Sequence, residues 1–103
     1  VLGDMLELGN KSETFHRELG ERVVESGIDL LITVGQMAKW IGRGAKKRGL
    51  ENSSNKSFED KEKAIGFLRE SLKPGDLVLV KGSRRMKLED LVEDLRRIYS
   101  NQS

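Results

Sequence analysis

Short apolar runs alternate with helical patterns along the chain, and this alternation limits the folds that the sequence can adopt. Leu30 to Val34 and Leu77 to Val80 are continuous apolar runs. Such runs are typical of neighbouring parallel strands in a sheet that is covered on both faces. Strands separated by helices need crossover connections, which place helices over the sheet. The sequence therefore predicts one α/β domain over residues 1–103, a three-layer Rossmann-like fold with a mainly parallel sheet and helices on both faces.

Capping residues mark the expected ends of the helices. Ser12 and Asp60 suit the N-terminal ends of helices. Gly27 and Gly49 suit the left-handed position that follows a helix. The polar stretch 50–57 is expected to form a loop or a weak edge strand. Apolar residues at helical spacing predict the buried faces of the first two helices, and these residues are Phe15, Leu19, Val23, Met37, Trp40 and Ile41.

The balance of charges and the lack of cysteine argue against several classes of function. The chain has 19 basic and 17 acidic residues that are mixed along its length, so the net charge of +2 does not indicate nucleic-acid binding. No apolar run approaches the roughly 20 residues that span a bilayer, so we expect a cytoplasmic protein with no membrane partner. With no Cys and one His, we expect neither disulfides, nor thiolate nucleophiles, nor a metal site built on these residues.

Two strings of residues lie where predicted strands end and helical patterns have yet to begin. The first runs from Leu2 to Gly9, and the second runs from Lys81 to Lys87. Open α/β sheets bind ligands beyond the carboxyl ends of their strands, close to helix N-termini that attract anions. The first string is acidic and the second is basic. A site that combines them suits a zwitterion or a charged acyl group.

The side chains in these strings have chemistry that suits such a ligand. Carboxylates accept hydrogen bonds from an ammonium group, Arg binds a carboxylate through two N–H groups, and small residues let a ligand approach the backbone. A structural alternative stays open, in which Asp4 caps a loop, Glu7 is solvated and Ser83 is a cap residue. The candidate substrate-binding residues are Asp4, Met5, Glu7, Lys81, Gly82, Ser83 and Arg84.

Other motifs indicate structure rather than chemistry. The sequence has no phosphate-binding loop, and the pair Gly42-x-Gly44 lies inside a predicted helix, so this chain alone is not expected to bind ATP or NAD. His16 is expected to be a surface or cap residue. The basic run 46–48 falls at a helix C-terminus, where cations interact favourably with the helix dipole, and is expected to be solvated.

The longest strings, and their order along the chain, resemble those of the C-terminal domain of the Mur ligases, in the MurF branch. Members of this branch are UDP-N-acetylmuramoyl-tripeptide:D-alanyl-D-alanine ligases of bacterial cell-wall synthesis. The resemblance covers essentially the whole chain. The residues that carry it are Val1 to Gly9, Ser12, His16 to Gly20, Val80 to Arg84, Met86, Lys87 and Glu89.

This resemblance implies a part of a longer enzyme. Such ligases use ATP and magnesium to form an acyl phosphate on the UDP-N-acetylmuramoyl peptide, and the amine of D-alanyl-D-alanine then attacks it. The nucleotide and UDP-sugar sites belong to other domains, and the C-terminal domain normally opens with one more strand and helix. The resemblance therefore implies that this chain is inactive alone, has no catalytic residue and faces the dipeptide. Lys81 and Arg84 would hold its carboxylate or steady the acyl phosphate, and Asp4 would hold its amine.

Two alternatives come from other classes of protein. A phosphoacceptor receiver domain also has acids at its first strand end and a Lys at a late one. It needs an Asp at the end of a middle strand, where this chain has Val34-Gly35-Gln36, so the sequence argues against that class. A free-standing interaction or regulatory module that kept the fold and lost the ligase activity stays open.

Overall fold

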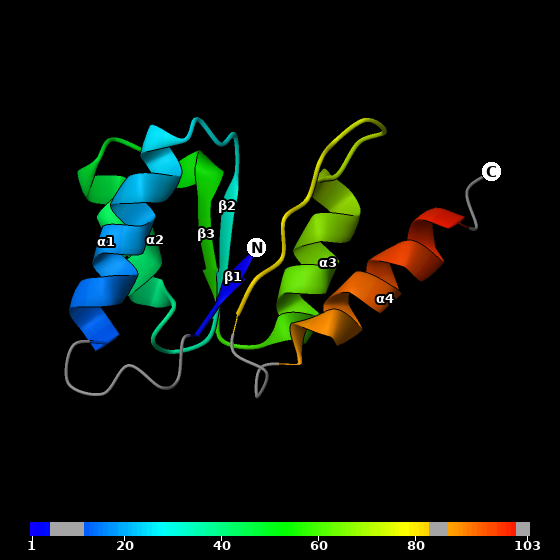
Figure 1. The fold of residues 1–103 in the computed structure, drawn as a ribbon. Coiled ribbons are helices and arrows are strands. Elements are labelled where there is room, and N and C mark those ends of the chain that lie inside the picture. The colour runs from blue at the N-terminus through cyan, green and yellow to red at the C-terminus, as the bar shows by residue number, and fades with distance from the viewer. Residues whose placement is uncertain (5–11, 83–86, 101–103) are drawn as a thin grey trace.

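The structure is a parallel sheet between two layers of helices (Figure 1). A computed structural model describes residues 1–4, 12–82 and 87–100. In the described part of the chain the sheet has three strands in the order β1-β2-β3, and both neighbouring pairs are parallel. All four residues of the central strand are buried. The strands are β1 (Leu2–Gly3), β2 (Leu31–Val34) and β3 (Asn55–Phe58).

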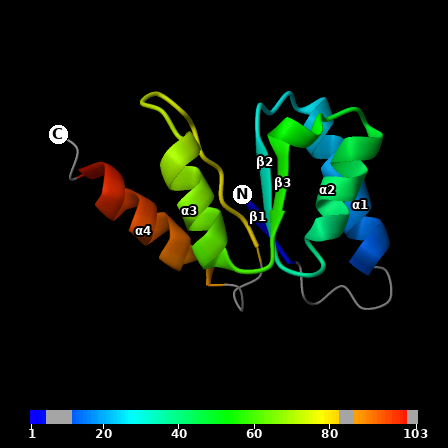
Figure 2. The ribbon, with the colours of Figure 1, turned by 180° about the vertical axis from the view of Figure 1, so that it is seen from behind.

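Helices cover the two faces of this sheet in sequential pairs. Figures 1 and 2 show α1 and α2 on one side of the strands and α3 and α4 on the other. A short 3₁₀ turn, Asn52–Ser54, leads into β3. This arrangement confirms the predicted three-layer α/β class. The helices are α1 (Ser12–Glu25), α2 (Lys39–Lys47), α3 (Lys61–Ser71) and α4 (Leu88–Ser100).

Side chains of β2 alternate between two apolar clusters, because successive residues of a strand point to opposite faces. Leu31 packs in the cluster under α1 and α2, together with Ile41 and Ala45. Ile32 and Val34 pack in the cluster under α3 and α4, whose other members are Ala64, Ile65, Leu68, Leu91 and Leu95. Burying a large aliphatic side chain stabilises a fold by about 1.5–3 kcal/mol. The central strand therefore holds both helical layers to the sheet.

The helices α1 and α2 pack with their backbones in contact at two glycines. A Cβ atom on Gly20 would lie 1.9 Å from the carbonyl oxygen of Ile41. A Cβ atom on Gly44 would lie 2.0 Å from the carbonyl oxygen of Arg17. Neither position can hold a larger residue without moving a helix. These two glycines let the backbones of α1 and α2 approach each other closely.

The close packing of α1 also changes which of its residues are buried. The predicted stripe began at Phe15, but that side chain is 48% exposed, so this prediction is wrong. His16 and Gly20 are buried instead, and Leu19 and Val23 are half-buried. The side of α1 that carries Gly20 approaches α2 most closely. The buried face of the helix is therefore centred about one residue along from the predicted apolar stripe.

The predicted helix ends at Gly27, Gly49 and Asp60 are confirmed. Gly27 and Gly49 have φ angles of 82° and 102°, in the left-handed region that favours glycine. The carboxylate of Asp60 accepts a hydrogen bond from the backbone N–H of Lys63 at 2.9 Å and so caps α3. The polar stretch after α2 does end in an edge strand, β3.

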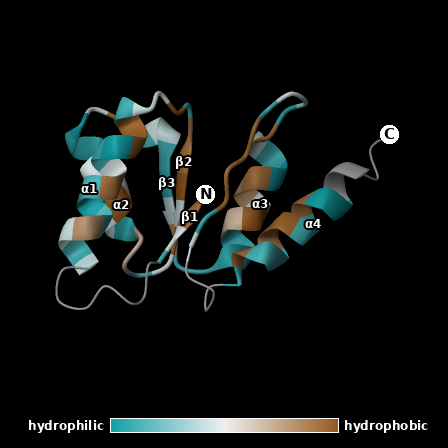
Figure 3. Cartoon of the chain, in the orientation of Figure 1, coloured by the Kyte–Doolittle hydropathy of each residue, from teal (hydrophilic) through white to brown (hydrophobic). Residues whose placement is uncertain are grey.

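The segment 77–80 differs from the prediction of a strand covered on both faces. It forms no regular strand, although a parallel bridge pairs Lys81 with Leu2 of β1. Leu77 is 98% exposed and Leu79 is 71% exposed, whereas Val78 and Val80 face α4. In Figure 3 the segment is a brown, apolar stretch beside β1. The described helices cover only one of its faces, and β1 offers it only two residues to pair with.

Candidate functional site

The carboxyl ends of the strands meet at one edge of the sheet, as the sequence predicts. The backbone N–H of Gly3 donates a hydrogen bond to the carbonyl of Lys81 at 2.8 Å, and Gly3 is paired with Val34 of β2. A Cβ atom on Gly82 would lie 3.2 Å from the Cα atom of Gly3. Figure 1 shows that α1, α2 and α3 also begin at this edge. Helix N-termini, which attract anions, therefore surround the strand ends.

Asp4 is held within the protein at this edge. Its side chain is 7% exposed, and its Oδ1 atom accepts a hydrogen bond from the backbone N–H of Ala38 at 2.5 Å. Gly35 lies so close that a Cβ atom there would be 2.5 Å from the carboxylate. A carboxylate is favourable where the chain enters a helix. The geometry thus supports the structural alternative, a cap on the turn before α2, and binding of an amine by Asp4 stays a prediction.

Lys81 presents a cation at the same edge. Its backbone N–H donates to the carbonyl of Val1 at 3.0 Å, while its side chain is exposed. Among the described residues, no acid forms an ion pair with it. Gly82 packs against the start of α4, where a Cβ atom would lie 2.8 Å from Leu88. The remaining candidates lie outside the described residues, and these are Met5, Glu7, Ser83 and Arg84.

His16 lies in α1 close to this edge and is buried rather than at the surface, so the prediction for it is wrong. It is 1% exposed. Its Nδ1 atom lies 2.5 Å from the carbonyl oxygen of Ser12, to which it donates, and 3.3 Å from the Ser12 hydroxyl. His16 lies one turn before Gly20 on the side of α1 that packs against α2, and no apolar pattern in the sequence marks this side. The ring holds the first turn of α1 in place.

Trp40 is half-buried, so its prediction as a core residue is also wrong. Ile41, its neighbour, is fully buried and fills the place toward the sheet. The indole ring lies beside cations from both α1 and α2. The basic run 46–48 is exposed as predicted, and it includes an ion pair between Arg48 and Glu25.

Polar side chains also join the sheet to α2. The hydroxyl of Thr33 donates to that of Ser57 at 2.7 Å, and the amide of Asn55 donates to the carbonyl of Gly42 at 2.7 Å. The Oδ1 atom of Asn55 is buried without a partner among the described residues. These contacts link β2, β3 and α2 and include no base that would activate the hydroxyls as nucleophiles. We assign them to structure.

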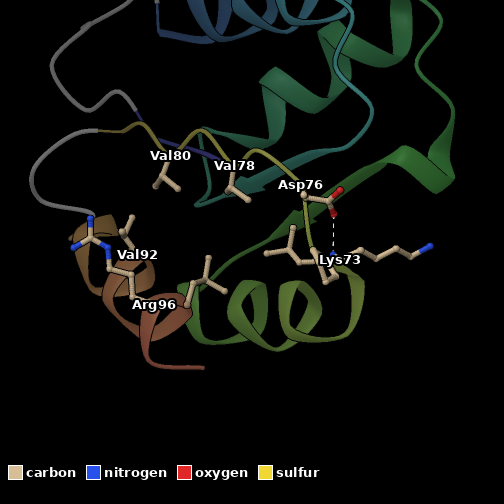
Figure 4. A pocket seen from close by; sticks show the side chains of 10 residues that line it. Lys73, Asp76, Val78, Val80, Val92 and Arg96 are labelled. Atoms are coloured by element: carbon tan, nitrogen blue, oxygen red, sulfur yellow. Dashed lines mark hydrogen bonds between the residues drawn. The ribbon is translucent and has the colours of Figure 1, made fainter. Parts of the chain in front are cut away.

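A cavity of about 390 Å³ lies between the segment 72–80 and α4, away from the strand ends (Figure 4). Val78, Val80 and Val92 point into it, so its wall is mainly apolar. The carboxylate of Asp76 accepts a hydrogen bond from the backbone N–H of Lys73 at 2.9 Å. Because its lining is mainly apolar and includes none of the candidate residues, we do not assign the cavity to the candidate site.

An ion pair links the starts of α3 and α4. The Nζ atom of Lys61 lies 2.7 Å from the carboxylate of Asp90. The hydrogen bond from Lys61 lowers the pKa of Asp90, and the same hydrogen bond raises the pKa of Lys61. Both groups are therefore charged at neutral pH.

The described residues lack two further features, a metal-binding cluster and a membrane-spanning helix. No group of three or more His, Asp or Glu side chains is placed to hold a metal ion. In the same part of the chain, the helices are too short or too polar to cross a membrane.

Comparison with known families places the whole sheet in one family. A family model described as "Mur ligase, glutamate ligase domain" matches residues 1–84. Two crystal structures of MurF from Acinetobacter baumannii are similar to this fold. The first has a TM-score of 0.79 and 32% sequence identity over 94% of this chain and 21% of that one. The second has a TM-score of 0.77 and 30% identity over 93% and 20%.

Curated sequences give the same result. A UDP-N-acetylmuramoyl-tripeptide--D-alanyl-D-alanine ligase from Bacillus subtilis is 42% identical over 95 residues, which are 92% of this chain and 21% of that protein. The ligase of the same description from Escherichia coli is 33% identical over 93% of this chain and 20% of that protein. The chain thus spans about a fifth of the length of these relatives.

Proposed function

Because the chain belongs to the family of Mur ligase C-terminal domains, we propose that it is the part of a longer ATP-dependent ligase that faces D-alanyl-D-alanine. The whole enzyme would use ATP and magnesium to activate a UDP-N-acetylmuramoyl peptide in the cytoplasm and join it to the dipeptide. The described residues do not fit the nucleotide or its metal, since they contain no metal-binding group and the sequence has no phosphate loop. We therefore assign this chain to the dipeptide.

The observation that carries this proposal is the close approach of the end of β1, at Gly3, to Gly82, which follows the bridge at Lys81. The backbones approach closely there, and Lys81 stands beside them without an ion pair in the described part of the chain. A dipeptide at this edge would find a cation for its carboxylate, and Arg84 follows two residues after Gly82. Holding the carboxylate fixes the direction of the amine, which must lose a proton and attack an acyl carbon as the leaving group departs.

Asp4 would act indirectly in this arrangement. Its carboxylate holds the turn between β2 and α2 through Ala38, and that turn forms one wall of the edge. A rigid wall keeps the dipeptide in a reactive position. Asp4 is thus a positioning residue in this proposal, although the sequence also allows direct contact with the amine.

The exposed leucines favour a part of a longer enzyme over a free-standing module. Leu77 and Leu79 lie on one face of a segment that already pairs with β1 at Lys81. Exposed apolar surface of this kind is typical of a face that another element covers. We propose that the rest of the ligase packs on it. A free-standing module would leave it in water.

A chimera tests the proposal. The corresponding segment of the Bacillus subtilis relative, which is 42% identical, would be replaced by this chain, and phosphate release would be measured with and without D-alanyl-D-alanine. We expect release that depends on the dipeptide, within about tenfold of the parent enzyme, whereas the chain alone should neither hydrolyse nor tightly bind ATP. A folded chimera that binds ATP but ignores the dipeptide would contradict the proposal.

A further inference from the structure

Cations from two helices surround Trp40 on the outer side of the layer formed by α1 and α2. The guanidinium carbon of Arg43 lies 4.3 Å from the ring centroid, and that of Arg17 lies 4.7 Å from it. The Nζ atom of Lys39 lies 5.6 Å away. Arg17 also pairs with Glu13 at 3.0 Å. Within the described residues, Lys39 and Arg43 have no acidic partner.

The position of these cations is unfavourable for α2 on its own. Lys39 is the first residue of the helix, and a helix N-terminus carries partial positive charge that repels cations. The helix has no acidic residue of its own over Lys39–Lys47, and the acid at this end is Asp4, whose carboxylate binds the N–H of Ala38. Local choices that oppose the fold are expected at functional sites. Contact with the indole stabilises these cations without neutralising them. Because only Arg17 has an acidic partner in the described part of the chain, the cluster keeps a positive charge that attracts anions.

We propose that Arg17, Lys39 and Arg43 form a docking surface for an acidic segment of a partner protein. The ring holds the two guanidinium groups from different helices in fixed places, and their N–H edges suit carboxylates. The three cations come from the N-terminal halves of α1 and α2, and these helices begin at the same end of the sheet as the strand ends (Figure 1). This inference goes beyond the proposed ligase function and does not depend on it.

Nucleic acid fits the surface less well than a short acidic segment does. Guanidinium groups already lie over the indole, so the ring is not free to stack on bases. The positive surface is also short. Lys47 lies 3.9 Å from Glu21, and Arg48 pairs with Glu25, so acids neutralise the far end of α2. Strong binding to a duplex needs many phosphate contacts along a longer track.

A membrane surface also fits less well. Helices that bind membranes insert an apolar face below a basic rim. The apolar face of α2 is already occupied, since Ile41 and Ala45 are fully buried against the protein. The large apolar side chains that are exposed in the described part of the chain lie outside α2, and these are Phe15, Ile28, Leu77 and Leu79.

Titration with poly-L-glutamate tests the docking surface. Trp40 is the only tryptophan in the sequence, so its emission reports on the cluster, and calorimetry gives the affinity. We expect saturable binding that changes the emission and weakens as salt is raised. Arg43→Glu should weaken binding at least about tenfold, because it replaces a charge-assisted contact by a repulsion. Arg69→Glu on exposed α3 makes the same change in net charge and should change affinity less than about twofold. Circular dichroism would verify that both variants fold.

Three results would overturn the inference. Equal weakening by Arg43→Glu and Arg69→Glu would mean that only net charge matters. Tighter binding of a DNA duplex, or of vesicles that contain phosphatidylglycerol, would assign the surface to nucleic acid or to a membrane. The third result is no binding at all. If the polymer supplied millimolar glutamate residues and neither binding heat nor a change in Trp40 emission were seen, there would be no docking surface.

Discussion

Two apolar runs that look alike in the sequence have different fates in the structure. Leu31 to Val34 forms the central strand and is buried throughout. The run 77–80 lies beside β1 but forms no regular strand and exposes Leu77 and Leu79. The first run has hydrogen-bonded neighbours on both sides and helices on both faces. An apolar run thus indicates a strand, but its burial depends on elements far away in the chain.

The largest difference between the two runs should appear on truncation of their side chains. Ile32→Ala removes atoms from a filled cluster and should lower the free energy of unfolding by about 2–5 kcal/mol. Leu79→Ala removes atoms that already lie mainly in water and should change it by less than about 0.5 kcal/mol. Urea unfolding of the chain measures both values. Similar losses in the two variants would show that the run 77–80 is buried in solution.

In a longer ligase, substitutions in the run 77–80 should destabilise the protein more, so the difference in stability effect between the two runs should become smaller. If the rest of the enzyme covers Leu77 and Leu79, changing both to Ser should destabilise the ligase by about 1.5–3 kcal/mol for each side chain. The same double variant of the chain alone should unfold at nearly the wild-type urea concentration, because both side chains are exposed there. Equal midpoints for the double variant and the wild type in the longer ligase would argue that nothing covers this face.

The ends of the two runs should also differ in function. Lys81 follows the exposed run, whereas Gly35 follows β2 and lies against the carboxylate of Asp4. In the chimeric ligase, Lys81→Ala or Arg84→Ala should lower kcat/KM for D-alanyl-D-alanine by roughly 10- to 100-fold, the equivalent of about 1.5–3 kcal/mol. Binding of ATP should change much less.

Lys46→Ala is the control for these cation variants. Lys46 lies in the last turn of α2, is exposed and should affect kcat/KM less than about twofold. If the kinetics of Lys81→Ala, Arg84→Ala and Lys46→Ala were the same, the edge at Lys81 would have a structural role only.

The sequence predicted the features that depend on local pattern. The α/β class, the buried central strand, the caps at Gly27 and Asp60, and the approach of the run that ends at Lys81 to the end of β1 all depend on residues close together in the chain or on the general rules of parallel sheets. The resemblance to the Mur ligases was also confirmed.

Features that depend on packing between distant residues were not predicted. The hydrogen bond from Ala38 to Asp4 joins residues 34 positions apart. The burial of His16 and the exposure of Phe15 follow from backbone contact at Gly20, which has no apolar signal of its own. The exposure of Leu77 depends on a covering element that the described residues do not supply. Local pattern identifies elements, whereas tertiary contacts decide which face of each is buried.

The smallest effect that we predict concerns the ion pair between α3, which packs on β2, and α4, which packs beside the run 77–80. The folded pKa of Asp90 is lowered, so its contribution to stability is present above the unfolded pKa of roughly 3.9 and is lost as the pH falls through the folded value. The folded pKa of Lys61 is raised, so its contribution is lost only as the pH rises through that value, above roughly 10.4.

Asp90→Asn should therefore destabilise the chain slightly at pH 7 and not at all at a pH where the wild-type carboxylate is protonated. The effect is small because the Asp90 side chain is 55% exposed and the pair is screened by solvent. Urea unfolding at pH 7 and over a series of acidic pH values, with and without added salt, measures it, and added salt should shrink the difference at pH 7. Asp29→Asn, at an exposed position without an ion pair in the described part of the chain, is the matched control. An equal loss in both variants, or a loss for Asp90→Asn that persists in acid, would mean that the two helical regions are held together by packing alone.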